Sequence, residues 1–315
     1  MHSALQPLLG GVVPPMATPL TEDARVDTDS LVSLRSRLFA GGVAGVFALG
    51  STGEAAYLTN AARRTVVQTL SAASAEDGLP LLVGVVEPTA ERVVEAATAL
   101  LTAQVSMLVA TGPFYATASH AEIVEHFEMI AAAVDVPVLA YNIPSNVGYE
   151  LPVPVVAELI ERGVVAGLKD SSANLTGLRQ LLEATDNRGD VAYFSGSDGL
   201  LDAALQVGAN GSVAGLANVA PELFAAALAA HAAGDAAGLA EAQARVFTLT
   251  RLYTTADPQT GLNSTQLGSI KTALKLQGAI DNDQLSKPMR RSSAAKTEAV
   301  AAILAEAGLD LVHTA

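Results

Sequence analysis

Short, almost continuously hydrophobic runs recur along the chain, separated by longer amphipathic stretches. The runs start 20 to 36 residues apart and hold seven or eight residues each. A short apolar run with little alternation is typical of a parallel β-strand covered on both faces. Eight runs fit this description: residues 12–18, 43–50, 79–86, 105–111, 136–142, 164–170, 191–197 and 211–218.

The stretches between the runs carry helix-start signals. Asp27, Thr59, Thr89 and Asn174 each precede residues in which apolar positions repeat at helical spacing. Such side chains can accept the free N–H groups of a first helical turn, so they predict that helices begin there. Eight alternations of strand and helix predict an α/β fold, a (β/α)8 TIM barrel. A doubly wound open sheet is the alternative.

The last part of the chain is predicted to be helical. It is rich in Ala, Leu, Glu and Lys, and no low-complexity linker precedes it. We therefore expect a barrel over residues 1–230 and a C-terminal helical subdomain over 231–315, packed on the barrel. Helices are predicted at 236–253, 266–278 and 294–308, and loops at 254–265 and 281–293, the latter broken by Pro288.

The composition narrows the possible functions. Half of the 315 residues are hydrophobic and 16% are charged, as in a folded protein with a large core. Cysteine is absent, which excludes disulfides, thiolate nucleophiles and cysteine-bound metal clusters. The 18 basic and 32 acidic side chains give a net charge of −14, which argues against a nucleic-acid partner.

The chain carries no sign of a membrane or secretory segment. No apolar stretch reaches the ~20 residues of a membrane span. The N-terminal residues 1–11 lack a charged region followed by a long apolar one. We therefore expect a cytoplasmic protein with no membrane partner.

Lys169 is the sharpest candidate for chemistry. In a (β/α)8 barrel the reactive groups stand at the C-terminal ends of the strands, and Lys169 ends the run 164–170. Partial burial there disfavours the charged amine, and a neutral amine can attack a carbonyl and form a Schiff base. The alternatives are a lysine that extends to solvent or one that pairs with Asp170.

Two further strand ends carry suitable groups. Tyr141 ends the preceding run, and its phenol can pass protons to and from a reacting centre; the alternative is an ordinary barrel tyrosine. The sequence GSTGE at 50–54 offers hydroxyls and flexible backbone N–H groups that suit a small carboxylate; the alternative is a plain turn. Glu54 either orients this turn or is solvated.

Metal and hydrolase signatures are missing from the sequence. The five histidines are scattered, and G-x-S-x-G occurs only at 208–212, out of register with a strand end. We therefore predict no metal and no serine nucleophile. The histidines are His2, His120, His126, His231 and His313.

Taken together, these motifs resemble the dihydrodipicolinate synthase / N-acetylneuraminate lyase family. The resemblance rests on GSTGE at 50–54, on Tyr141 within YNIPSNVG and on Lys169 within GLKDSS. The segments 14–20 and 211–223 are similar as well. The resemblance implies a pyruvate-linked class I aldolase or dehydratase, a (β/α)8 barrel and a homotetramer built as a dimer of dimers. It implies no metal and no cofactor beyond a covalent Schiff base.

The resemblance also implies roles for individual residues. Lys169 matches the Schiff-base lysine, and Tyr141 matches the proton-transfer tyrosine. Ser51 matches a member of the proton relay, and Tyr115 matches a tyrosine that joins the relay from a neighbouring subunit. The remaining matches bind substrate: Thr52 and Gly53 at the 2-oxo acid carboxylate, and Gly196 and Val213 along the pyruvate pocket.

Asn146 departs from the family's synthases, which typically carry arginine at this position. An amide cannot form the charge-assisted fork that a guanidinium makes with a carboxylate. Ser51, where the synthases usually have threonine, is shared with the neuraminate-lyase side of the family, and Asp170-Ser171-Ser172 is seen among its sugar-acid members. These residues favour cleavage or dehydration of a 2-oxo acid, such as a 2-keto-3-deoxy sugar acid.

Other functions stay open. One is a 4-hydroxy-tetrahydrodipicolinate (dihydrodipicolinate) synthase, which condenses pyruvate with aspartate semialdehyde. Another is a non-catalytic 2-oxo-acid binding or regulatory protein, because fold does not fix function. A metal-dependent aldolase is a weaker choice.

Overall fold

A computed structural model describes residues 6, 8–255 and 257–312. Its centre is a parallel sheet whose strands follow one another in chain order, each paired with the next. A doubly wound sheet would reverse its strand order near the middle, so that alternative is wrong. The strands are β1 (Val46–Ala48), β2 (Leu81–Val85), β3 (Val105–Thr111), β4 (Val138–Asn142), β5 (Gly167–Asp170), β6 (Ala192–Ser195) and β7 (Gly211–Ser212).

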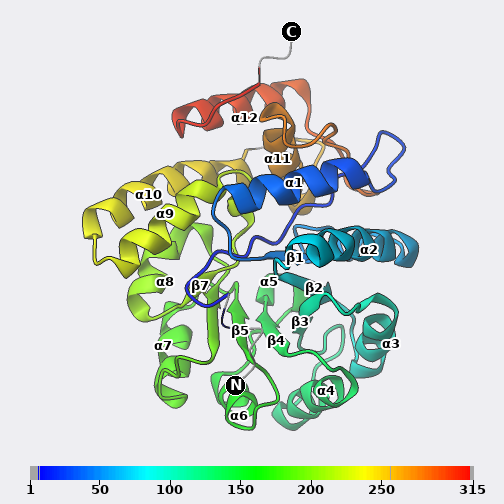
Figure 1. Cartoon of the computed structure of the whole chain (residues 1–315), viewed down its shortest axis with the longest axis vertical. Helices are drawn as coiled ribbons and strands as arrows, with labels where there is room; N and C mark the ends of the chain where they lie inside the picture. The colour runs from blue at the N-terminus through cyan, green and yellow to red at the C-terminus, as the bar shows by residue number, and fades with distance from the viewer. Residues whose placement is uncertain (1–5, 7, 256, 313–315) are drawn as a thin grey trace.

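The first apolar run closes the sheet into a barrel. Val12 bridges to Ser212 of β7, and Pro15 bridges to Phe47 of β1, both in parallel. In Figure 1 this N-terminal segment passes between β7 and β1. We expected a regular strand over 12–18, and that expectation is wrong in detail. Pro14 and Pro15 have no N–H to donate, which limits the pairing to isolated bridges.

Helices surround the barrel, as the alternating pattern predicted. The side chains of Asp27, Thr59 and Asn174 each accept a backbone N–H at a helix start, whereas Thr89 precedes its helix without such a bond. The helices are α1 (Thr28–Ala40), α2 (Asn60–Asp77), α3 (Ala90–Leu100), α4 (His120–Ala133), α5 (Pro144–Val147), α6 (Val153–Glu161), α7 (Leu175–Ala184), α8 (Leu201–Val207) and α9 (Pro221–Ala232), with 3-10 turns η1 (Asp198–Leu200) and η2 (Gly215–Asn218).

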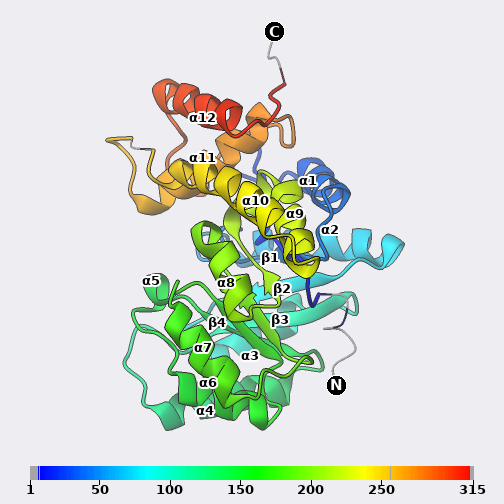
Figure 2. The same ribbon diagram turned by 90° about the vertical axis from the view of Figure 1, so that its left-hand side faces the viewer.

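Three further helices follow at the C-terminal end of the chain. Figure 2 shows them gathered at one end of the molecule, where α10 packs against α9 and α11 against α12. We expected the second of them to begin at residue 266, but Gly261 accepts the Thr265 N–H and starts the helix at Leu262. The elements are α10 (Ala236–Leu249), η3 (Thr250–Tyr253), α11 (Leu262–Leu276) and α12 (Ala294–Glu306). The division at residue 230 stays a prediction.

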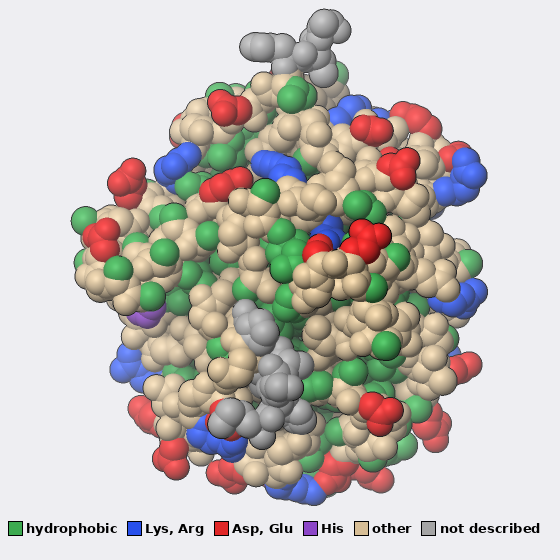
Figure 3. Space-filling view, in the orientation of Figure 1, with side chains coloured by type: hydrophobic (Ala, Val, Ile, Leu, Met, Phe, Trp, Pro, Cys, Tyr) green, Lys and Arg blue, Asp and Glu red, His purple; other side chains and the backbone are tan. Residues whose placement is uncertain are grey.

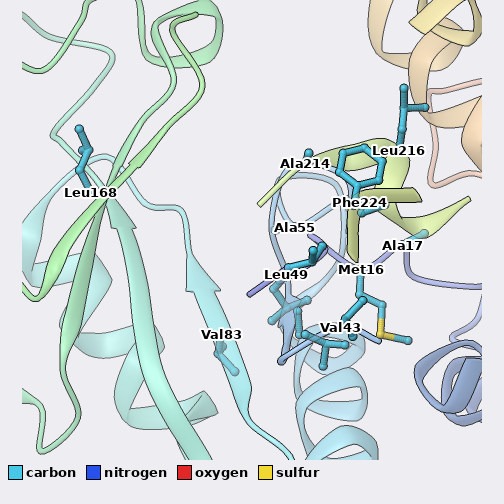
Figure 4. Close-up of a cluster of buried hydrophobic side chains, with 14 of the residues drawn as sticks. Met16, Ala17, Val43, Leu49, Ala55, Val83, Leu168, Ala214, Leu216 and Phe224 are labelled. Atoms are coloured by element: carbon cyan, nitrogen blue, oxygen red, sulfur yellow. The ribbon is translucent and has the colours of Figure 1, made fainter. Parts of the chain in front are cut away.

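The side chains of each strand alternate between two separate apolar layers, one inside the barrel and one between the strands and the helices. On β4, Val138 and Ala140 belong to the layer between strands and helices, whereas Leu139 and Tyr141 belong to the cluster inside the barrel. Successive side chains of a strand point to opposite faces, so this parity decides which groups enter the barrel. Figure 4 shows part of the outer layer, which includes Met16, Ala17, Val43, Leu49, Ala55, Val83, Leu168, Ala214, Leu216 and Phe224.

The charged side chains of one face of the molecule are dispersed. On the face drawn in Figure 3, acidic and basic side chains are interspersed among polar and apolar ones. The net charge of −14 therefore forms no single acidic patch on this face.

Candidate active site

A cavity of about 380 Å³ opens at the C-terminal ends of the strands. Groups that follow β1, β2, β6 and β7 form one part of its wall, together with the ends of β4 and β5, and α11 closes another side. Chemistry in (β/α)8 barrels takes place at this end. The residues that line it include Ser51, Thr52, Tyr57, Tyr141, Ser145, Asn146, Lys169, Ser171, Gly196, Asp198, Val213, Tyr253, Asn263, Gln266, Leu267 and Ile270.

Lys169 and Tyr141 meet inside the barrel. They are direct partners in the register of β4 and β5, so their side chains point the same way. The Lys169 Nζ lies 4.0 Å from the centre of the Tyr141 ring and 4.9 Å from that of Phe47. The two rings themselves meet edge to face, with centres 6.4 Å apart. The amine therefore rests against two ring faces, which attract a cation.

The two alternative interpretations of Lys169 do not describe this structure. Its side chain is only 2% exposed, so it does not extend to solvent. The Asp170 carboxylate instead accepts from the Asn142 amide at 2.8 Å and from the Ser172 hydroxyl at 3.0 Å. Burial, the largest influence, raises the pKa of Asp170. Lys169 is left facing the cavity.

The GSTGE turn follows β1 and reaches the same cavity. Ser51 and Thr52 line it, whereas Gly53 is buried behind the wall, where its carbonyl accepts from the Thr18 hydroxyl at 2.8 Å. A side chain at Gly53 would come within 3.0 Å of the Met16 carbonyl oxygen, so only glycine fits there without a shift. Glu54 is buried, which excludes the solvated interpretation.

The remaining predicted binding residues also line the cavity. Val213 is buried in its wall, and Asn146 is exposed on α5, where its Oδ1 accepts from Ser145 Oγ at 2.8 Å. The Gly196 N–H donates to the Asp170 carbonyl at 2.7 Å. A side chain at Gly196 would collide with Ser171 Oγ and come within 3.1 Å of the Asp170 carbonyl oxygen, so these two loops pack closely and Ser171 would have to turn to admit it.

Tyr115 is not brought to the cavity of its own chain. It is fully exposed and is not among the described residues that line the cavity. Its backbone has φ +76°, a left-handed conformation that costs a non-glycine residue about 1–3 kcal/mol. The loop after β3 thus holds an aromatic side chain outward at an energetic cost.

The structure adds an acid and a phenol that the sequence argument did not select. Asp198 opens η1 just after the run 191–197, and its carboxylate accepts from the Leu216 N–H and the Tyr253 hydroxyl, both at 2.8 Å. Burial raises the pKa of Asp198 to about 6, although these two bonds and the Lys169 charge oppose it. Burial, with the nearby Asp198, raises the pKa of Tyr253 well above its ordinary value.

A sequence signal exists for only one of these two residues. The strand-end rule that selected Lys169 applies equally to Asp198, which directly follows the run 191–197. Tyr253 lies in the C-terminal helical region, where no pattern in the chain marks it.

The charged groups of the cavity are few. Among the described residues that line it, Lys169 carries the only cation and Asp198 the only carboxylate. Neutral donors and acceptors supply the other polar contacts, among them Tyr57, Asn263 and Gln266. The cavity is therefore suited to a ligand with one anionic end and an uncharged polar remainder.

Metal-site geometry is not seen in the part of the chain that the structure covers. No group of three or more His, Asp or Glu side chains converges there in a way that could hold an ion. His126 is buried against the Thr111 carbonyl, 3.1 Å away, and His2 and His313 lie outside the described residues. Among the described helices, none combines the length and apolar character needed to cross a membrane.

The closed parallel barrel and the position of its cavity define a (β/α)8-barrel enzyme. A sequence model of the dihydrodipicolinate synthetase family matches residues 8–307. The chain belongs to this family and is one of its lyases.

Curated relatives agree with this assignment. An uncharacterized DapA-like lyase of Halobacterium salinarum is 38% identical over 216 residues, which are 68% of this chain and 69% of the relative. A 4-hydroxy-tetrahydrodipicolinate synthase of Methanosarcina mazei is 31% identical over 212 residues, or 67% of this chain and 72% of the relative.

Solved structures share the fold along nearly the whole chain. Dihydrodipicolinate synthase from Bacteroides thetaiotaomicron superposes with a TM-score of 0.88 at 26% identity, over 95% of this chain and 98% of that one. YagE, a prophage protein of the dihydrodipicolinic acid synthase family from E. coli K12 solved in complex with pyruvate, gives a TM-score of 0.88 at 24% identity, over 95% and 99% of the two chains. At 24% identity the latter likeness shows the fold alone.

Proposed function

We propose that this protein is a Schiff-base lyase that cleaves or dehydrates a 2-oxo acid, with a 2-keto-3-deoxy sugar acid as the substrate class. The observation that carries the proposal is the buried Lys169 amine, 4.0 Å from the Tyr141 ring centre at the carboxyl end of the barrel. An amine in this place can attack a ketone, and a phenol beside it can move the protons that the addition requires.

The proposed reaction uses protein groups alone. The Lys169 nitrogen adds to the C2 ketone, and loss of water gives an iminium that withdraws electrons from C3. Either the C3–C4 bond then breaks, or a C3 proton leaves before the hydroxyl at C4. Tyr141 and Ser51 are assigned the proton transfers, and Thr52 and the Gly53 backbone the C1 carboxylate.

The other polar groups of the cavity support a substrate that is uncharged and hydroxylated beyond its C1 carboxylate. Among the described residues that line the cavity, the polar side chains besides Lys169 are amides, hydroxyls and the Asp198–Tyr253 pair. A hydroxyl can donate to a carboxylate and accept from an amide, whereas a second substrate carboxylate would find no guanidinium at Asn146. We assign Asn146, Gly196 and Val213 to substrate binding.

Tyr115 is proposed to act across a subunit interface in a homotetramer. Its full exposure and its left-handed backbone support a role outside its own cavity. A cytoplasmic location, the absence of a cofactor and the division into a barrel and a helical subdomain belong to the same proposal.

Borohydride trapping tests the proposed function. Incubation with pyruvate and borohydride should add the mass of a reduced pyruvate adduct to the peptide that contains Lys169. A panel of 2-keto-3-deoxy acids, followed by pyruvate and 2,5-dioxo acid detection, separates cleavage from dehydration. An unlabelled Lys169 contradicts the proposal, and adduct formation without turnover of any acid favours a non-catalytic binder.

A second candidate function is 4-hydroxy-tetrahydrodipicolinate synthase, because the Methanosarcina mazei relative carries that name. Asn146→Arg is expected to raise kcat/KM for aspartate semialdehyde about ten- to a hundred-fold, since a guanidinium can grip its carboxylate. Ser145→Arg, which places the same charge one residue away on the rim, is the control. Wild-type synthase activity that is already high and unchanged by Asn146→Arg would contradict the substrate class.

Asp198 is expected to give the reaction a pH dependence. Above its pKa of about 6 the carboxylate faces the positive nitrogen at position 169, and below it this support is lost. We expect kcat/KM to fall as the pH drops through about 6. Asp198→Asn should remove this acid limb and lower the plateau about tenfold, equivalent to about 1.4 kcal/mol.

Asp170→Asn provides the control for the pH profile. It removes another buried carboxyl whose pKa is raised, but one that does not line the cavity. An acid limb that survives in Asp198→Asn, or disappears in Asp170→Asn, would assign the ionisation to another group.

A further inference from the structure

The turn that carries Ser51 and Thr52 ends in a buried, conformationally costly glutamate. Glu54 has φ +62°, in the left-handed region that glycine favours, and its side chain is fully enclosed. The Glu54 N–H donates to the Ser51 carbonyl at 3.1 Å, which closes the turn, and the Glu54 carbonyl accepts from the N–H of Tyr57 at 2.8 Å. The position of the Glu54 side chain is therefore tied to the position of the two hydroxyl residues before it.

The partner of Glu54 comes from the C-terminal part of the chain. Lys271 of α11 forms an ion pair with Glu54 Oε1 and donates from its Nζ to the Gln284 carbonyl at 2.7 Å. The second carboxylate oxygen of Glu54 accepts the Ser286 N–H at 2.7 Å. The two charged residues cannot be exchanged. The Gln284 carbonyl needs a donor, which Lys271 supplies, and the Ser286 N–H needs an acceptor, which Glu54 supplies.

The ion pair connects two walls of the cavity. On one side stands the turn with Ser51 and Thr52, and on the other α11, which places Gln266, Leu267 and Ile270 on the cavity. Lys271 directly follows Ile270 in this helix. A shift of the pair would move the turn relative to the opposite wall.

We propose that Glu54 and Lys271 are positioning residues that hold the Ser51–Gly53 turn in register with α11 and so set the affinity for the substrate carboxylate. Neither touches the substrate, and the role rests on the proposed function of this turn as the carboxylate site. Displacement of a binding group by about 1 Å can cost up to ~10²-fold in a reaction rate, so even a small shift of the turn would be measurable.

The test separates positioning from stability. Glu54→Gln and Lys271→Met each leave one buried charge unpaired, which destabilises strongly, whereas the double variant removes both charges and is expected to be more stable than either. In the double variant we expect the pyruvate concentration for half-maximal trapping to rise about tenfold or more, with a smaller change in the maximal trapping rate. Glu54→Asp keeps the charge but withdraws it by one methylene. It should likewise raise the pyruvate concentration for half-maximal trapping more than it changes the maximal trapping rate.

The control is a second ion pair that lies away from the cavity. Arg35 joins α1 to Asp77 at the end of α2 through two bonds of 2.7 Å. The double variant Arg35→Met with Asp77→Asn should lower the melting temperature without altering the pyruvate dependence. If the Glu54 and Lys271 variants behave like this control, the positioning role is wrong.

Calorimetric binding of pyruvate distinguishes this inference from the proposed function. Pyruvate that binds wild-type protein without labelling Lys169 contradicts the Schiff base. In that case a pyruvate Kd raised about tenfold in Glu54→Asp still supports the positioning role, and an unchanged Kd overturns it.

Discussion

Replacing Lys169 by methionine is expected to lower kcat by a factor on the order of 10⁴ to 10⁶, the range known for loss of a nucleophile in covalent catalysis. Methionine fills a similar volume, and its sulfur makes favourable contacts with aromatic rings, so it can replace the amine against Tyr141 and Phe47. The barrel should therefore stay folded while the reacting nitrogen is lost. Steady-state turnover of the active sugar acid and mass spectrometry after borohydride trapping measure the effect.

Lys275→Met is the matched control for this variant. Lys275 lies on α11, partly exposed, and contacts Asp283 at 3.4 Å. Its replacement should leave both turnover and the adduct at Lys169 unchanged. Turnover within tenfold of wild type in Lys169→Met, or an adduct on another lysine, would move the nucleophile elsewhere.

Tyr141→Phe is expected to have the second largest effect, a fall in kcat of about 10²- to 10⁴-fold. The substitution keeps the ring that lies against the Lys169 amine and meets Phe47 edge to face, and removes only the hydroxyl. Pyruvate should still be trapped at Lys169, but more slowly, because proton transfer in the addition would rely on water. Rapid-quench trapping rates and steady-state kcat measure the two effects separately.

Tyr193→Phe offers a control with the same chemical change. Tyr193 is buried on β6, and its hydroxyl lies 2.6 Å from that of Thr185, in the layer between strands and helices. This variant should lose stability without a specific loss of kcat. If the two variants reduce kcat equally, the Tyr141 hydroxyl has no special part in proton transfer.

Much of the barrel could be predicted because each strand can be recognised from its own short stretch of sequence. A continuous apolar run indicates a strand that is buried on both faces. Because successive side chains of a strand point to opposite faces, the positions of Tyr141 and Lys169 within their runs place both side chains inside the barrel. The run at 12–18 shows the limit of this argument. Its apolar side chains are buried as expected, but regular pairing depends on N–H groups that Pro14 and Pro15 lack.

The parts of the cavity that could not be predicted depend on contacts between distant segments. Tyr253 meets Asp198 across 55 residues of sequence, and Lys271 meets Glu54 across more than 200. In each of these pairs, no sequence pattern around one residue indicates the other. From the sequence alone, Glu54 could either be solvated or orient the turn. Only the packing of α11 against the barrel shows that its side chain is buried.

The absence of tryptophan has a practical consequence for spectroscopy. The chain contains six tyrosines, and three of them, Tyr57, Tyr141 and Tyr253, line the cavity. Near-ultraviolet absorption and intrinsic emission must therefore come mainly from tyrosine, with half of the chromophores beside the bound ligand. The protein thus carries its own optical reporter of substrate binding, which needs no label and no coupling enzyme.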